Sequence, residues 1–335
     1  NPKPQTPNPK PQTPNPIKIK PNNLKINTSN TSKIKMFALL TLALFCASII
    51  AQQPSVDSRI PLIGILMQNG PPLLASQVPN PWELYTVVPA SYVDWIAQTG
   101  AVPVLVPYDT PKARLDKILA NIQGFIFPDE TKGATFDSAK EGVQKTISYI
   151  IEYSKSLKDK NNTDFPLFGI GTGMLHIIAS TSSPSLITTD HWEKPTDKVI
   201  TVDATALNSS LFFGKLSQVS RDYAFSEGSM YVAYQNSITR ASLETTEGKA
   251  IADEFLTVGW FMADDAESDE DANGQLLALV EHKKYPWYGS IFQPQATQYE
   301  RIPDNRFLDR SPQAIRFVLD MADTFVEMAR ITSST

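Results

Sequence analysis

The feature that most constrains the fold is an alternation of short apolar runs with amphipathic stretches, which begins at Ile60. The apolar runs are typical of buried strands, and the stretches between them have the apolar spacing of helices. Strands that alternate with helices form a parallel sheet covered by helices on both faces. The sequence therefore predicts an α/β fold with a mainly parallel central sheet.

The expected elements follow this alternation in order along the chain. The first strands are expected at Ile60–Gln68, Val102–Pro107, Gly124–Pro128 and Pro166–Gly169. The helices between and after them are expected at Pro89–Thr99, Lys112–Asn121, Phe136–Lys158 and Met174–Ser180. Later strands are expected at Val199–Val202, Ser229–Tyr234, Phe255–Ala263, Leu276–Glu281 and Trp287–Phe292, and a last helix at Pro312–Arg330. Since composition does not change between the halves, we expect one domain.

The first 51 residues differ from the rest of the chain. They contain seven Lys, no acidic residue, eight of the 26 prolines and the only cysteine, Cys46. Residues 1–35 are rich in Pro, Asn and Lys and cannot bury apolar area, so we expect a disordered extension. Residues 36–51 form an apolar run that ends in small residues, which is typical of a signal peptide and too short to span a bilayer.

A signal peptide normally starts its chain, so the position of Met36 leaves open whether residues 1–35 are translated. The expected mature part is residues 52–335, delivered through the secretory pathway to a lumen or to the outside, with no membrane span. Asn161–Thr163 and Asn208–Ser210 fit the N-glycosylation pattern, which suits that route.

Charge and cysteine content exclude several functions for residues 52–335. This part holds 23 basic and 35 acidic side chains, a net charge of about −12, which argues against a nucleic-acid partner. It contains no cysteine, so a disulfide, a cysteine-ligated zinc ion and a cysteine nucleophile are excluded.

The turn after the fourth expected strand has the spacing of a nucleophile elbow, in which a tight turn lifts one side chain clear of the sheet. The central position of Gly169–Gly173 is Gly171, which has no side chain to attack a carbonyl. Thr172 is adjacent, but the neighbouring side chain in an elbow points elsewhere. The same glycines resemble a dinucleotide motif, but the third comes one residue early, so no cofactor is expected.

A resemblance to a known family rests on six segments that occur in this order along the chain: Ile60–Gln68, Ala90–Val93, Gly124–Pro128, Phe165–Gly169, Tyr285–Gly289 and Ser311–Ala314. In these segments the chain resembles gamma-glutamyl hydrolases, which cleave folate polyglutamates and belong to the class I glutamine amidotransferase-like superfamily. The resemblance implies a flavodoxin-like three-layer sandwich, a Cys–His–Glu site, and a secreted, lysosomal or vacuolar location.

The reactive positions that the resemblance implies are all replaced. The nucleophilic cysteine falls on Gly171. The family motif Trp-His-Pro-Glu reads Phe292–Gln295, so Gln293 stands for the general base and Gln295 for its orienting carboxylate. Without a nucleophile, a triad retains only the residual catalysis of binding and oxyanion contacts. The sequence therefore predicts no catalytic residue in this site.

The remaining residues of the former site are candidates for binding. A second family histidine falls at Gln235, and the Pro-Gly-Gly turn of the oxyanion site reads Pro128, Asp129 and Glu130. Two carboxylates beside a developing oxyanion would oppose hydrolysis. A different chemistry could instead use Thr172, Asp129 and Glu130. The alternative is that the carboxylates of Asp129 and Glu130 are both exposed in a simple turn.

Our leading hypothesis is an inactive gamma-glutamyl-hydrolase-like protein that binds a glutamyl or folate-like compound or a protein partner. An active hydrolase with relocated residues and a structural component of a larger assembly are the alternatives, and a homodimer stays open. Asp269, Asp271 and Asn273 match the start of a calcium loop, but position twelve is Val280, so a solvated loop is the favoured interpretation and no metal is expected.

Overall fold

The computed structural model describes residues 60–69, 86–129, 141–181, 187, 196–232, 236–263, 274–300 and 308–332. The chain divides into two units, Asn1–Val56 and Asp57–Thr335, and every described residue belongs to the second unit. The predicted extension and signal peptide, residues 1–35 and 36–51, lie outside the described residues.

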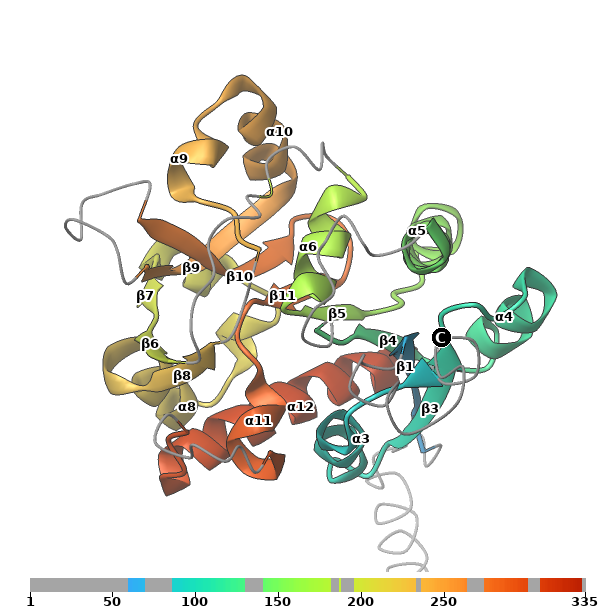
Figure 1. Cartoon of the computed structure of the whole chain (residues 1–335), viewed down its shortest axis with the longest axis horizontal. Helices are drawn as coiled ribbons and strands as arrows, with labels where there is room; N and C mark the ends of the chain where they lie inside the picture. Colours follow the sequence, from blue (N-terminus) through green and yellow to red (C-terminus); the bar gives the residue numbers. More distant parts are fainter. Residues whose placement is uncertain are drawn as a thin grey trace, which may run out of the picture. The chain divides into compact units, whose positions relative to one another are not determined.

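A central sheet organises the second unit (Figure 1). Among the described residues it has nine strands in the order β2-β1-β4-β5-β11-β10-β9-β7, with β3 pairing on β1 beside this path. The bounds are β1 (Leu62–Asn69), β2 (Thr86–Val87), β3 (Val102–Pro107), β4 (Gly124–Phe127), β5 (Leu167–Ile170), β7 (Thr201–Val202), β9 (Phe255–Met262), β10 (Gln275–His282) and β11 (Trp287–Ser290). β3, β1, β4, β5 and β11 are parallel, and the other strands pair antiparallel. A separate two-stranded sheet pairs β6 (Thr196–Val199) with β8 (Ser229–Val232).

Helices cover both faces of the central sheet (Figure 1). One face carries α3 (Ala90–Ala97) and α12 (Pro312–Thr332), which are joined by a 2.8 Å hydrogen bond from Trp95 Nε1 to the Val318 carbonyl. The other face carries α4 (Lys112–Leu119), α5 (Glu141–Asn161) and α6 (Thr172–Ala179). The predicted α/β class, a flavodoxin-like three-layer sandwich with a mainly parallel sheet, is confirmed.

The remaining helical segments are short, and all of them follow β7 in the chain. They are α7 (Ala204–Ser209), the 3-10 turn η4 (Phe213–Lys215), α8 (Gln218–Asp222), the π-helical turn η5 (Tyr223–Glu227), α9 (Arg240–Leu243), α10 (Thr246–Glu254) and α11 (Pro294–Tyr299). Of the helices in the described part of the chain, none is long and apolar enough to cross a membrane.

The core explains why the middle strands lack the alternating pattern of half-buried strands. All residues of β4, β5 and β11 are buried, as expected for central strands with helices on both faces. Phe168 on β5 packs its ring against Trp95 and Phe325 at centroid distances of 6.1 and 5.9 Å. These contacts fix α3 and α12 against the middle of the sheet.

The sequence predicted the longer elements to within a few residues, but it missed β2, β6 and the short helical segments after β7, including α10 and α11. α10 buries only one large side chain, Ile251, so its apolar periodicity is weak. α11 starts with Pro294 directly after Gln293, inside the motif Phe292–Gln295, where no helix was predicted. Residues 136–140 of the predicted helix Phe136–Lys158 lie outside the described residues, and α5 is described from Glu141.

His282, at the end of β10, is buried together with Val280, two residues before it: they are 6% and 1% exposed. β10 is covered on both faces, so alternate residues need not face solvent. His282 Nδ1 accepts hydrogen bonds from the backbone N–H groups of Lys284 and Tyr285, at 3.0 and 3.1 Å, and holds the turn to β11.

Candidate functional site

The candidate site lies where the parallel strands end, at the turn between β5 and α6. Gly171 is buried in this turn with φ 58° and ψ −123°, a backbone conformation that favours glycine. Its N–H donates to the Ser290 carbonyl on β11 at 2.8 Å, and its carbonyl accepts from Met174 N–H at 3.1 Å. The tight strand-to-helix turn of a nucleophile elbow is therefore present, without the nucleophile.

The space above Gly171 is filled by the side chain of Asp129, which follows β4. A Cβ atom added to Gly171 would lie 2.2 Å from both Cγ and Oδ1 of Asp129, and 2.8 Å from its Cβ. Such distances are far shorter than van der Waals contact, so any side chain at position 171 would have to displace the carboxylate. Asp129 thus occupies the place from which an elbow nucleophile would act.

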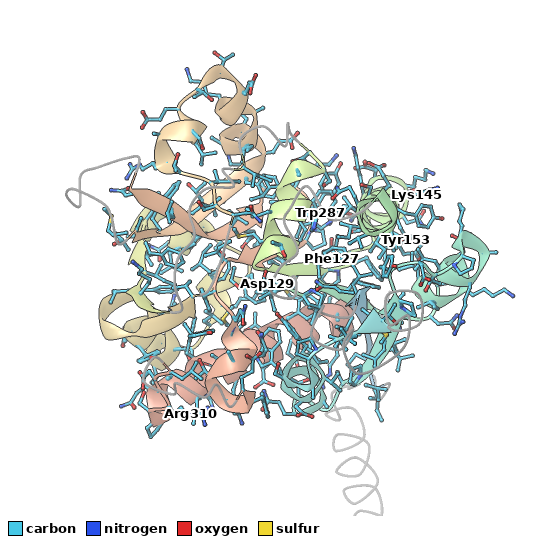
Figure 2. The ribbon with its side chains drawn as sticks, in the orientation of Figure 1. Phe127, Asp129, Lys145, Tyr153, Trp287 and Arg310 are labelled. Atoms are coloured by element: carbon cyan, nitrogen blue, oxygen red, sulfur yellow. The ribbon has the colours of Figure 1, made fainter. Side chains whose placement is uncertain are left out.

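Hydrogen bonds hold the Asp129 carboxylate in this place. Oδ1 accepts from the backbone N–H of Thr172 at 2.8 Å and from its hydroxyl at 3.0 Å. Oδ2 accepts from Gln293 Nε2 at 2.7 Å. Figure 2 shows Asp129 near the ribbons of α6 and β11, in agreement with these partners. In a nucleophile elbow the N–H after the nucleophile is an oxyanion-hole donor. Here that donor is bound to a carboxylate of the chain itself.

The backbone of Asp129 is held as firmly as its side chain. Its N–H donates to the hydroxyl of Tyr92 on α3 at 3.1 Å. Gln68, at the end of β1, donates through Nε2 to the carbonyls of Pro128 and Asp129 at 3.2 and 2.9 Å. Asp129 is therefore not an exposed carboxylate in a simple turn. Sequence reasoning missed the role of Gln68, although it is a polar residue at the carboxyl end of a parallel strand, where such sites form.

Gln293 and Gln295 lie at the start of α11, but they have different surroundings. Gln293 contacts Asp129 through its amide nitrogen, as described above. Gln295 is fully buried, and its Nε2 lies 3.4 Å from the Glu300 carboxylate. Its Oε1 has no hydrogen-bond partner among the described residues, an uncommon state for a buried acceptor. The structure therefore brings Gly171, Asp129, Thr172 and Gln293 together and places Gln295 beside them, next to Tyr92.

Two tyrosines next to these groups remain protonated donors. Burial raises the pKa of Tyr92 well above its usual value, and the negative charge of Asp129 adds to the increase. Burial also raises the pKa of Tyr231, with further contributions from the carboxylates of Glu300 and Asp129. The Tyr231 carbonyl accepts from the Gln293 N–H at 3.3 Å, which links β8 to the site. The polar groups described here can bind and orient a ligand, but neither Gln293 nor Gln295 can exchange a proton near neutral pH.

Several residues predicted from the sequence lie outside the described residues. These are Glu130 and Gln235 of the former site and Asp269, Asp271 and Asn273 of the calcium-loop pattern. Within the described ranges, no group of three or more His, Cys, Asp or Glu side chains is arranged to hold a metal ion.

Comparisons with known proteins bear on the fold and the family. The family model described as Peptidase C26 matches residues 61–182, which include β1 through α6. The chain is 24% identical over 299 residues to gamma-glutamyl hydrolase B of Dictyostelium discoideum, covering 89% of this chain and 79% of that protein. It is 22% identical over 286 residues to gamma-glutamyl hydrolase of Bos taurus, covering 83% of this chain and 80% of that protein. Among solved structures, it is similar to a glutamine amido transferase from Methylobacillus flagellatus, with a TM-score of 0.43 and 8% identity. The match covers 81% of this chain and 96% of that chain.

Proposed function

From its membership of the gamma-glutamyl hydrolase family, we propose that this chain is a member that does not hydrolyse its ligand and acts by binding. The ligand class we propose is a glutamyl or folate-like compound. The observation that carries the proposal is the Asp129 carboxylate in the place of the elbow nucleophile, 2.2 Å from where a Cβ at position 171 would lie.

Acyl transfer needs a nucleophile, a free oxyanion donor and a general base, and the described site lacks all three at the family's positions. No nucleophile stands at Gly171, and the backbone donor of Thr172 is bound to Asp129. A tetrahedral oxyanion would have to displace this carboxylate, and the remaining negative charge would oppose its formation. Gln293, at the position of the general base, donates to Asp129 and cannot accept a proton from a nucleophile. Binding without turnover is the function that these groups still support.

A calorimetric titration of the full chain with a folyl-polyglutamate, combined with an assay for free glutamate, tests this proposal. We expect saturable heat and no glutamate. Continuing heat with glutamate release would contradict the loss of hydrolysis. Absence of heat would contradict the proposed ligand class, and copurification with a partner would then favour a binding or structural role within a larger assembly.

A second candidate function, a hydrolase with relocated chemistry, is favoured by one contact. The Thr172 hydroxyl donates to Asp129 Oδ1 at 3.0 Å, which is the geometry of a hydroxyl nucleophile beside a carboxylate. This alternative predicts glutamate release that is abolished by Thr172→Val and by Asp129→Asn. Release that persists in both variants would remove it.

The location we propose is the secretory pathway, ending outside the cell or in a lysosomal or vacuolar lumen. This proposal depends on the signal-peptide pattern of residues 36–51. Expression of the natural transcript with a carboxyl-terminal tag, followed by protease protection of isolated membranes, tests it. A tag that protease digests without detergent would contradict a luminal location.

A further inference from the structure

A concavity lies at the opposite end of the sheet from Asp129, where β5 and β11 begin. Its volume is about 160 Å³, and its walls come from the Lys283–Pro286 turn, the segment after α5, η4 and the end of α12. A water molecule takes about 30 Å³ in the liquid, so the space holds a small polyatomic ion with some water. The candidate site described above contributes none of these walls.

The charge of this concavity is opposite to that of the surrounding protein. Four lysines line it against a single acidic residue: Lys158, Lys215, Lys283, Lys284 and Asp164. Residues 52–335 as a whole carry a net charge of about −12, with 23 basic and 35 acidic side chains. His282 also lines the space, and burial lowers its pKa to about 4, so it adds no charge near neutral pH. A local excess of cations in an acidic protein favours an anionic ligand.

Two of the four lysines are already paired. Lys158 contacts Asp164 at 2.8 Å, and Lys284 contacts Asp159 at 2.7 Å. Both pairs are partly exposed and so contribute little to stability. They do hold the two ammonium groups at the edge of the concavity, where they add to its positive potential.

The other two lysines have no carboxylate partner among the described residues. Lys283 Nζ donates to the Ala252 carbonyl at 2.7 Å, which leaves its charge uncompensated. Lys215, on η4, is exposed and forms no side-chain hydrogen bond or ion pair within the described residues. The Lys215 ammonium is therefore available to an anion from solution, and Lys283 adds a positive charge to the lining.

Tyr288 supplies an uncharged donor at the same place. The residue is 2% exposed, and its ring stacks on Phe212 with the ring centroids 4.7 Å apart. Its hydroxyl has no hydrogen-bond partner in the described part of the chain, although the residue lines the concavity. Burial raises the pKa of Tyr288 above its usual value, so the hydroxyl keeps its proton. A donor that the protein leaves without a partner can bind an acceptor of a ligand.

An apolar rim borders the cationic floor. Leu211 and Ile331 are 64% and 61% exposed, both large for aliphatic side chains, and both line the concavity together with Met328. Exposed apolar side chains that gather beside a polar concavity mark a contact surface. A ligand that fits both parts carries an anionic group next to an apolar group.

We propose that this concavity binds a phosphomonoester, with its phosphate facing Lys215 and Tyr288 and its apolar portion against Leu211 and Ile331. Lysine ammonium groups bind phosphate as point charges, and a phosphate has acceptors enough for several donors at once. The site differs from the former hydrolase site in position, in charge and in ligand. It does not depend on the proposed loss of hydrolysis.

Titration of the full chain with phenyl phosphate by calorimetry at low ionic strength tests this site. We expect saturable binding that weakens about tenfold or more in Lys215→Gln and in Tyr288→Phe, because each loses a hydrogen bond to a charged group. Tyr288→Phe keeps the ring that stacks on Phe212, and Lys215 is exposed, so neither change threatens folding. Lys117→Gln, an equal charge change on the exposed face of α4, is the matched control and should bind as the parent does.

Two further probes test which part of the ligand contributes to binding and whether the phosphomonoester comes from a lipid or from a soluble compound. Inorganic phosphate should bind in the same site more weakly than phenyl phosphate, because it lacks the apolar contact. Vesicles with and without phosphatidic acid show whether a lipid headgroup supplies the phosphomonoester, and binding that requires Lys215 and Tyr288 in either arm supports the site. Failure of the parent chain to bind any of these probes, or equal affinity in Lys215→Gln, Tyr288→Phe and Lys117→Gln, would overturn it.

Discussion

The two ends of the parallel sheet differ in how their hydrogen-bond donors are used. At the carboxyl end, the backbone donor of Thr172 and the amide of Gln293 both bind the Asp129 carboxylate. At the amino end, Tyr288 and Lys215 face a concavity and have no partner among the described residues. The fold therefore holds one anion-binding arrangement that the chain fills itself and one that it leaves open to solvent. A site can lose its chemistry because the nucleophile position is filled as well as because its reactive groups are replaced.

The largest expected effect on stability concerns the carboxyl end of the parallel sheet, the end that Asp129 fills (the filled end). Gly171→Ala should lower the free energy of unfolding by about 2–5 kcal/mol, because it adds a strained φ and displaces the Asp129 carboxylate. Gly100→Ala is the matched control, since Gly100 has φ +79° but its added Cβ would meet only Arg330 Nη2 at 3.8 Å. Gly100→Ala should cost only the strain of an alanine at positive φ, about 1–2 kcal/mol. Urea unfolding measures both, and equal losses would show that Asp129 does not restrict position 171.

A double-mutant cycle sharpens the same point. In the background of Asp129→Gly, the cost of Gly171→Ala should fall to that of the strained backbone alone, about 1–3 kcal/mol. The substitution keeps the backbone groups that bind Tyr92 and Gln68, so the turn itself is retained. A cost for Gly171→Ala that is unchanged in this background would contradict a contact between the two residues.

At the amino end of the parallel sheet, where the concavity is open to solvent (the open end), His282 should make the free energy of unfolding depend on pH. Its pKa is lowered from 6.5 to about 4, first by burial and then by the neighbouring Lys284. Below pH 6.5 the unfolded chain binds a proton that the folded chain does not, so stability falls as the pH decreases from about 6.5 to about 4. The expected loss from this group is at most about 3 kcal/mol over that range.

Unfolding measurements at several pH values check the His282 prediction. His282→Asn keeps an acceptor for the turn but removes the titrating group, so the loss of stability on acidification should become smaller. The filled end has glutamines at positions 293 and 295, and these do not titrate. A pH dependence that is the same in the parent chain and in His282→Asn would assign it to other groups.

The smallest expected effect concerns the support of Asp129. Gln68→Ala removes two hydrogen bonds to the carbonyls of Pro128 and Asp129 and should cost about 1–2 kcal/mol of unfolding free energy. It should also lower the cost of Gly171→Ala, because a less restrained Asp129 can move aside. A Gln68→Ala protein as stable as the parent would show that side-chain contacts alone hold Asp129.

The sequence predicted the parallel part of the fold because each strand there is an apolar run bounded by turns. The bounds of β3 were predicted to the residue, and those of β1, β4 and β5 to within two. The short helices after β7 were missed, since a helix such as α10 buries too little apolar surface to show a period. His282 is buried against the alternation expected of a half-buried antiparallel strand, because β10 is covered on both faces.

The candidate site was predictable only in part. The spacing around Gly171 indicated an elbow, and the resemblance identified Gln293 and Gln295 as replacements. The position of the Asp129 carboxylate could not be derived, because it depends on contacts with Thr172 and Gln293, which are 43 and 164 residues away in the chain. Such contacts are set by the packing of β4, β5 and α11 and leave no local pattern in the sequence.

The measurement that tests the central claim most directly is glutamate release from a folyl-polyglutamate by two reconstructed variants. The first combines Gly171→Cys, Gln293→His and Gln295→Glu, and the second adds Asp129→Gly. The account predicts release by the second variant only, because the new cysteine side chain and the Asp129 carboxylate would occupy the same space. Equal release by both variants would contradict the claim that Asp129 closes this site.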